Sequence, residues 1–395
     1  MRPVPVLLVL LLAVVAAAAP HVDNSAAPRD GVQTLHPREL WRRGDPDDDL
    51  LFGALRTVQT GPDGAVYALD TQLAQVFVFG DDGALLRTLS REGDGPGETR
   101  RPEDLVFLPD GSLGIGVYLG GKIVRLTLDG TPLGSLLPPG DATSGEGMSS
   151  IRRVRSRAGV TVVNGVRMTQ DDDGGMLRTQ YLVRVDAEGR PLQEYLSATV
   201  PSNLMRDGWI EKRNYFPSHE RWDIDREGRI LAAAERNDYR ISVYDPAGPL
   251  LRSFGRPFEP RPRTEEEKQE IRDNLVVLQD GQRIRVDVQV EEAAPVIQEV
   301  LARDDGETWV LPIRPRGTAP DGVLASYDVF DADGAYVRRV DLALPGDSSE
   351  DRVFLLGPDR CAVVRGAVGA RRGAFGGGDA ATDEAPVHDL AVYAW

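Results

Sequence analysis

The chain has 395 residues, of which 41% are hydrophobic and 27% charged, the composition of a globular protein long enough to bury a large core. It carries 62 acidic and 46 basic residues and a net charge of −16, which argues against nucleic acid or an anionic membrane surface as a partner, because both attract clustered Lys and Arg. A single cysteine, Cys361, excludes an internal disulfide and a cysteine-based zinc site.

Residues 1–18 have the pattern of a secretory signal peptide. The positive charge of Arg2 precedes an apolar run from Val4 to Val15, and small alanines follow. This run is shorter than the about 20 apolar residues that span a membrane, and no cysteine follows it to carry a lipid. We therefore predict a flexible lead over residues 19–31 and an extracytoplasmic (periplasmic or secreted) protein without a membrane span or lipid anchor.

From residue 32 to residue 395, turns that end in glycine recur before short apolar strands. Asp-Gly and Glu-Gly supply the positive φ that tight hairpin turns need. The first turn of each repeat lies at 62–64, 109–111, 157–159, 226–228, 304–306 and, more weakly, 358–360. A second turn follows in the first five repeats and ends at Gly83, Gly130, Gly189, Gly248 and Gly334. The pattern predicts an all-β fold, a six-bladed β-propeller of four-stranded antiparallel blades.

The two ends of the chain indicate how the ring closes. The sixth unit ends with an apolar strand at His388–Trp395, so its fourth strand is missing. Glu39–Gly44, which precedes the first unit, resembles fourth strands elsewhere, such as Leu250–Gly255. We therefore expect the N-terminal strand to complete the last blade and to join the ends of a chain that has no disulfide.

Two insertions interrupt the repeat, at residues 190–220 and 256–296. In the second, Thr264 is followed three residues later by Glu267, a capping box that predicts a short helix over residues 265–277. Insertions of this kind usually cross one face of a repeat scaffold and often carry its functional residues.

Two junctions resemble those of a known group of proteins. Arg91–Glu98, followed by Arg101 and Pro102, is similar to the G-x-GPGE-x-x-x-P junction of bacterial six-bladed β-propeller proteins related to NHL repeats, within the TolB-like and regucalcin-like propellers. Ala294–Gln298 with Asp305–Val310 resembles a late blade of the same family. The resemblance implies secretion, a six-bladed ring and, for most members, no established activity. More distant relatives with this fold include metal-dependent lactonases of the regucalcin type and amidating lyases, whose chemistry the fold alone does not transfer.

No metal ligand set is predicted. The acidic stretches Asp47–Asp49, Asp171–Gly174 and Asp331–Gly334 lack the alternating ligands and distal glutamate of a calcium loop, and we interpret them as solvated turns. No cofactor is predicted either, although the pattern leaves open a structural or axial divalent cation such as calcium.

Charged residues are expected at the entrances of the innermost strands, around the axial channel: Glu103, Asp104, Arg153, Arg221, Asp223, Glu299 and Asp351. This set mixes arginine with carboxylates, whereas a dication site should offer mainly anionic or neutral oxygen. We interpret the set as salt bridges that line the channel. A metal-dependent lactonase or other hydrolase, or a lyase, with its site in the channel stays the alternative.

An aromatic and basic group in the first insertion is the candidate ligand site: Trp209, Arg213, Tyr215, Phe216 and His219. Such residues can stack on a sugar or clamp a peptide, or they can pin the loop onto the ring. The sequence thus predicts a monomeric binding or interaction scaffold without catalytic residues. Its partner is an unknown protein, peptide or glycan bound by loops on one face, and a structural role in an envelope assembly stays open.

Overall fold

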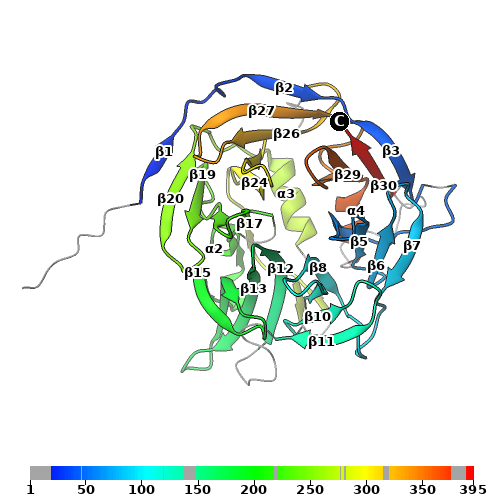
Figure 1. Cartoon of the computed structure of the whole chain (residues 1–395). Coiled ribbons are helices and arrows are strands. Elements are labelled where there is room, and N and C mark those ends of the chain that lie inside the picture. The colour runs from blue at the N-terminus through cyan, green and yellow to red at the C-terminus, as the bar shows by residue number, and fades with distance from the viewer. Residues whose placement is uncertain are drawn as a thin grey trace, which may run out of the picture.

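The computed structural model describes the chain from residue 19 to the end, except residues 46, 119, 138–147, 218–219, 276, 280–281, 315–319 and 375–387. The predicted signal peptide, residues 1–18, lies outside the described residues. Six antiparallel blades surround a central axis (Figure 1). The predicted all-β, six-bladed propeller is therefore confirmed.

Within the first five blades, the strands follow one another in chain order from the axis outward. Blade 1 consists of β4 (Leu55–Thr60), β5 (Val66–Asp70), β6 (Gln75–Phe79) and β7 (Leu85–Leu89). Blade 2 consists of β8 (Pro102–Phe107), β9 (Leu113–Val117), β10 (Ile123–Leu126) and β11 (Pro132–Leu136). Blade 3 consists of β12 (Met148–Arg157), β13 (Val160–Gln170), β14 (Met176–Val185) and β15 (Pro191–Pro201). Blades 4 and 5 consist of β17 (Trp222–Ile224), β18 (Ile230–Ala232), β19 (Arg240–Tyr244) and β20 (Leu250–Gly255); and β24 (Ile297–Ala302), β25 (Thr308–Pro312), β26 (Val323–Phe330) and β27 (Tyr336–Ala343).

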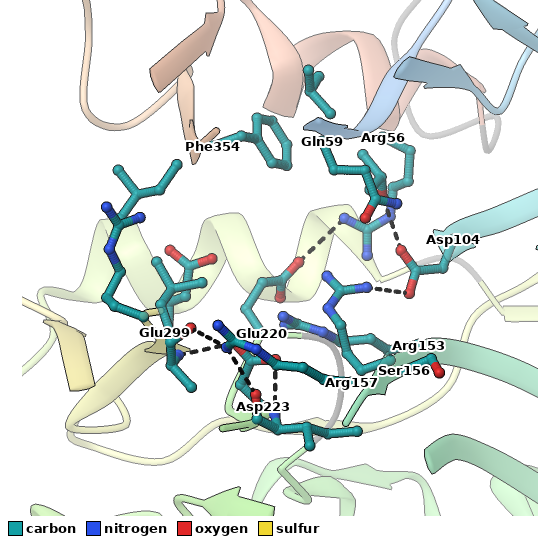
Figure 2. A pocket seen from close by; sticks show the side chains of 18 of the residues that line it. Arg56, Gln59, Asp104, Arg153, Ser156, Arg157, Glu220, Asp223, Glu299 and Phe354 are labelled. Atoms are coloured by element: carbon teal, nitrogen blue, oxygen red, sulfur yellow. Dashed lines mark hydrogen bonds and ion pairs between the residues drawn. The ribbon is translucent and has the colours of Figure 1, made fainter. Parts of the chain in front are cut away.

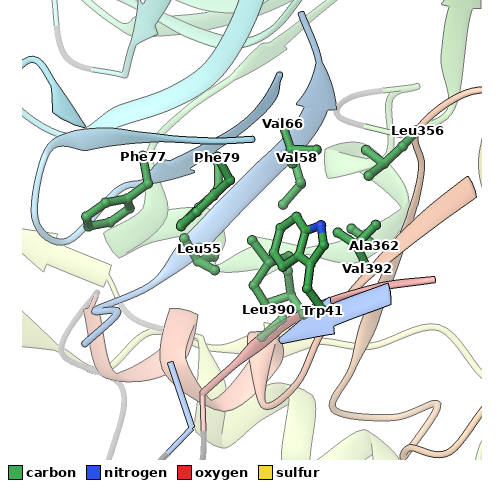
Figure 3. Packing of buried hydrophobic residues seen from close by; sticks show 13 residues of the cluster. Trp41, Leu55, Val58, Val66, Phe77, Phe79, Leu356, Ala362, Leu390 and Val392 are labelled. Carbon is green, nitrogen blue, oxygen red and sulfur yellow. The ribbon is translucent and has the colours of Figure 1, made fainter. Parts of the chain in front are cut away.

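Blade 6 joins the two ends of the chain, as predicted. It consists of β28 (Arg352–Leu355), β29 (Arg360–Val364), β30 (Leu390–Ala394) and, outermost, β3 (Arg38–Arg43). β3 pairs antiparallel with β30, with Trp41 opposite Val392. Trp41 is buried in a cluster that holds apolar residues of blades 6 and 1 (Figure 3). Strand pairing and apolar packing thus close the ring together.

The segment expected as a flexible lead, residues 19–31, instead runs along the outer edges of two blades. Its β1 (His21–Asp23) pairs in parallel with β20 of blade 4. The N–H groups of Arg29 and Asp30 donate to the carbonyls of Tyr336 and Val337, and β2 (Val32–Leu35) then pairs in parallel with β27 of blade 5. An outer strand leaves backbone groups unpaired at its edge, and this N-terminal belt satisfies them (Figure 1).

The two insertions lie on one face of the ring. Connections between successive antiparallel strands alternate between the two faces, so the repeated glycine turns after the first and third strands of a blade share one face and the insertions share the other. The first insertion is shorter than predicted, because Pro191–Pro201 forms β15, and it contains α1 (Leu204–Asp207), β16 (Trp209–Ile210) and α2 (Glu211–Asn214). The second contains α3 (Glu265–Asn274), β21 (Val277–Gln279), β22 (Gln282–Ile284) and β23 (Val288–Gln289). Thr264 and Glu267 form the predicted capping box, and α4 (Ala367–Ala374) connects β29 to β30 on the same face.

Two glycines with the same backbone conformation allow a direct test of the closure. Gly83 and Gly64 have φ values of 79° and 81°, but a Cβ on Gly83 would lie 2.8 Å from the Trp41 ring, whereas a Cβ on Gly64 would meet nothing within 4 Å. We expect Gly64→Ala to cost about 1–2 kcal/mol for the left-handed backbone. Gly83→Ala should cost about 1–3 kcal/mol more for overpacking. Urea unfolding of both variants measures the difference, and equal losses would contradict the tight contact with Trp41.

Candidate functional site

The two insertions are joined to each other, and together with α4 they are here called the cap. The cap thus consists of α1, α2, α3, α4, β16 and β21–β23. β16 pairs in parallel with β23, with Trp209 opposite Val288. The Glu211 carboxylate accepts hydrogen bonds from Arg236 at 2.8 Å, from Arg263 at 2.6 and 2.9 Å, and from the Glu291 N–H at 2.9 Å. Burial alone would raise the pKa of Glu211, but these donors outweigh it and lower that pKa. An ionised Glu211 therefore ties the two insertions together.

The cap reaches the charged groups on the axis. α3 and α4 lie inside the ring in Figure 1, and Arg372 of α4 pairs with Glu270 of α3 at 2.9 Å. Arg371 of α4 lies 3.3 Å from Glu103, which is almost completely buried. Arg56, at the start of β4, lies 3.4 Å from the same Glu103 carboxylate and 3.2 Å from Glu220. Arg56 and burial both lower the pKa of Arg371, so guanidinium groups crowd together beneath the cap.

An axial cavity of about 240 Å³ lies among the inner strands (Figure 2). Six arginines contribute to its wall: Arg56, Arg152, Arg153, Arg155, Arg157 and Arg303. Four carboxylic acids contribute as well: Asp104, Glu220, Asp223 and Glu299. The wall of the cavity is therefore rich in arginine, although the protein as a whole is acidic.

Two of the four acids hold neighbouring blades together. Asp104 of β8 accepts hydrogen bonds from the Val154 N–H at 2.8 Å and from Arg155 at 2.9 Å, both on β12. Asp223 of β17 accepts from the N–H groups of Ile224 and Ala302, each at 2.9 Å, and Ala302 belongs to β24. Both carboxylates therefore join one inner strand to the next.

Glu299 differs from the other acids in the cavity wall. Among the described residues, no hydrogen-bond donor contacts its carboxyl group. Burial raises the pKa of Glu299 to about 8. The nearby Glu220 and Asp223 carboxylates also raise this pKa, whereas Arg153 and Arg155 lower it. Below that pH the side chain is a neutral acid that can donate a hydrogen bond into the cavity.

Four of the seven predicted channel residues, Asp104, Arg153, Asp223 and Glu299, line the cavity. Glu103 lies beneath the cap, paired with Arg56 and Arg371. Arg221 donates to the Ile297 carbonyl at 2.9 Å, and Asp351 accepts from the N–H groups of Asp347 and Gly366.

The aromatic and basic group of the first insertion is divided between core and surface. Phe216 is buried in the core cluster that contains Trp222. Tyr215 donates its hydroxyl to the carbonyls of Ala233 and Glu235 at 3.2 and 3.3 Å. Trp209 is half-buried in β16 and Arg213 is exposed, while His219 lies outside the described residues. Tyr215 and Phe216 thus pin the loop to the ring.

Sequence reasoning did not select Arg155 and Arg157 of β12. A period-2 signal was present, because Arg153, Arg155 and Arg157 alternate in the sequence and, since β12 extends to Arg157, share one of its faces; the repeat pattern assigns Arg157 to the following turn instead. Arg157 donates to the carbonyls of Ile224 and Ala302 at 3.2 and 2.8 Å. This row of arginines supplies much of the positive charge of the cavity.

The residues of the cavity do not fit a divalent cation, because guanidinium groups surround its carboxylates. Over the described part of the chain, no group of three or more His, Cys, Asp or Glu side chains is placed to hold a metal ion. In the acidic turn at Asp171, the carboxylate accepts from the N–H groups of Asp173 and Gly175, as in a structural turn. None of the helices in the described ranges is long and apolar enough to cross a membrane.

Comparison with known proteins finds no matching family model and no matching curated protein. Several solved structures are similar. They include a candidate exported protein from Bacteroides fragilis (12% identity, 92% of this chain and 99% of that one, TM-score 0.44) and a virginiamycin B lyase from Staphylococcus aureus (8% identity, 90% and 98%, TM-score 0.43). A PQQ-bound aldose sugar dehydrogenase from Streptomyces coelicolor has 12% identity over 90% of this chain and 98% of that one, with a TM-score of 0.41. The strand order and ring closure define the class of this chain, a six-bladed β-propeller.

Proposed function

We propose that this protein is an extracytoplasmic binding scaffold that holds its ligand at the axis, beneath the cap. The observation that carries the proposal is the contact between the cap and the cavity wall: Arg371 of α4 pairs with Glu103, and Glu103 pairs with Arg56, which lines the charged cavity. A cavity of about 240 Å³ has room for a small molecule, or for one end group of a peptide, a glycan or an envelope protein. The signal-peptide pattern of residues 1–18 supports export.

The hydrogen-bond partners of the cavity carboxylates favour a binding function over metal-dependent hydrolysis. Asp104 and Asp223 accept hydrogen bonds from backbone N–H groups of the neighbouring strand, so a metal ion would have to displace donors that hold the blades together. Arginine next to these acids would also oppose a dication.

The test is a binding screen of the purified mature protein against glycans, peptides and cell-envelope fractions. We expect Arg371→Ala to weaken the binding of any hit at least tenfold, because it removes a group that joins the cap to the axis. Trp209→Ala combined with Arg213→Ala should weaken binding less, since neither side chain lines the cavity. Thermal melting checks that the variants fold. A screen without hits, or full binding by the Arg371→Ala variant, would contradict the proposal.

A further inference from the structure

The charges along the axis favour an anionic occupant. Six arginines face four acids in the cavity wall, and one of the acids, Glu299, is neutral below about pH 8. The cavity therefore has a positive excess at neutral pH. Low-dielectric walls strengthen the attraction of such a site for an anion relative to the same charges in water.

Arg155 offers a preorganised edge for that anion. Its Nη1 donates to Asp104 at 2.9 Å and to the Val154 carbonyl at 2.8 Å, which hold the guanidinium in place. Its Nε and Nη2 have no hydrogen-bond partner within the part of the chain that is described, and 26% of the side chain is exposed. These two nitrogens form the side-on fork that pairs with two oxygens of a carboxylate or phosphate.

Glu299 is the second group available to a ligand. The charged and titratable groups that face it are Arg153 and Arg155 of β12, Glu220, Asp223 of β17 and Tyr327 of β26. As a neutral acid, Glu299 does not repel an anion and can donate a hydrogen bond to one of its oxygens. Once ionised, it would repel the same anion.

We infer that the axial cavity binds a small carboxylate or phosphate, with the Nε and Nη2 of Arg155 as its direct partners and the Glu299 carboxyl group as a hydrogen-bond donor. This inference rests on the proposed function, since it names the chemical class of the ligand at the same site. The binding step is non-covalent and needs no further reactant.

The experiment is calorimetric titration of the mature protein at constant ionic strength with inorganic phosphate, succinate, gluconate and, as the uncharged control, glucose. We expect at least one of the three anions to bind and glucose not to bind. Binding of phosphate alone or of carboxylates alone identifies the source of the anionic group. Arg155→Gln should weaken binding at least tenfold, whereas Arg91→Gln, which changes the net charge equally at an exposed site, should not.

Two further variants keep the test informative. If Arg155→Gln does not fold, Arg155→Lys retains the charge without the fork and should still weaken binding several-fold. In the wild type, the anion affinity should fall above pH 8, by up to about tenfold per pH unit as Glu299 ionises. Glu299→Gln should remove this pH dependence and still bind at pH 7.

The outcomes separate the two proposals. Anion binding that survives Arg155→Gln in a folded protein overturns the inference. If a neutral glycan or peptide binds beneath the cap and no anion does, the inference fails and the proposed function stands. If neither the anions nor the members of the larger screen bind, both fail.

Discussion

Trp41→Ala is expected to lower the free energy of unfolding by about 3–5 kcal/mol, the range for truncating a large buried aromatic side chain. Trp41 is only 8% exposed, and its ring centroid lies 5.5 Å from that of Phe79 in blade 1. The same cluster contains Val392 of blade 6 (Figure 3). Loss of the indole would thus leave a cavity at the boundary where the ring closes.

The neighbouring Leu40 provides a matched control on the same strand. Its side chain is 39% exposed, so Leu40→Ala should cost less than about 1 kcal/mol. Equilibrium unfolding in guanidinium chloride, followed by tryptophan fluorescence and far-ultraviolet circular dichroism, measures both variants. Equal losses in the two variants would mean that the Trp41 contacts contribute little to closure.

The blades could be predicted from the sequence because their signals are local. An Asp-Gly or Glu-Gly turn followed by a few apolar residues defines a hairpin without reference to the rest of the chain. The strand predicted to close the ring, Glu39–Gly44, also coincides with β3 to within one residue at each end. Counting strands at the two ends of the chain was enough to pair them, because a propeller blade needs four.

The N-terminal belt and α4 could not be predicted in this way. Pairing of β1 with β20 joins residues far apart in the sequence, such as His21 and Ser253, and a parallel pair has no turn to mark it. Ala367–Ala374, which forms α4, has no capping box like that of α3. The glycine-turn repeat predicts only structure that depends on interactions between neighbouring residues in the chain. The N-terminal belt and α4 depend on contacts with residues that are distant in the sequence.

The candidate site, too, could be predicted from the sequence only in part. Strand position located Asp104, Arg153, Asp223 and Glu299 in the cavity wall, whereas Glu103, Arg221 and Asp351, chosen by the same reasoning, do not line it. Hydrogen-bond partners decide which of them is available to a ligand. Asp104 is held by Val154 and Arg155, whereas no described donor contacts Glu299. This difference between Asp104 and Glu299 depends on side-chain contacts between blades, which cannot be predicted from the sequence of one strand.

Asp328→Asn should cost about 3–5 kcal/mol, because it leaves a buried guanidinium without its anion. Asp328 of blade 5 is fully buried and accepts hydrogen bonds from Tyr239 and Tyr336, each at 2.7 Å, and from the Nε of Arg256 at 2.9 Å. Arg256 and Tyr239 belong to the blade 4 side, so the carboxylate joins two blades. Burial raises the pKa of Tyr239 and Tyr336, and both therefore stay protonated donors at neutral pH.

A double-mutant cycle with Arg256→Met separates the ion pair from general damage. The uncharged double variant, Asp328→Asn with Arg256→Met, should lose less stability than the sum of the two single losses, because neither charge is then left buried alone. Asp333→Asn, at an exposed turn position of the same blade, is the control and should cost less than about 0.5 kcal/mol. Additive losses in the cycle, measured by urea unfolding at pH 7, would show that Asp328 and Arg256 act independently. Coupling between them would show that the boundary between blades 4 and 5 depends on a buried ion pair, whereas the closure at Trp41 depends on apolar packing.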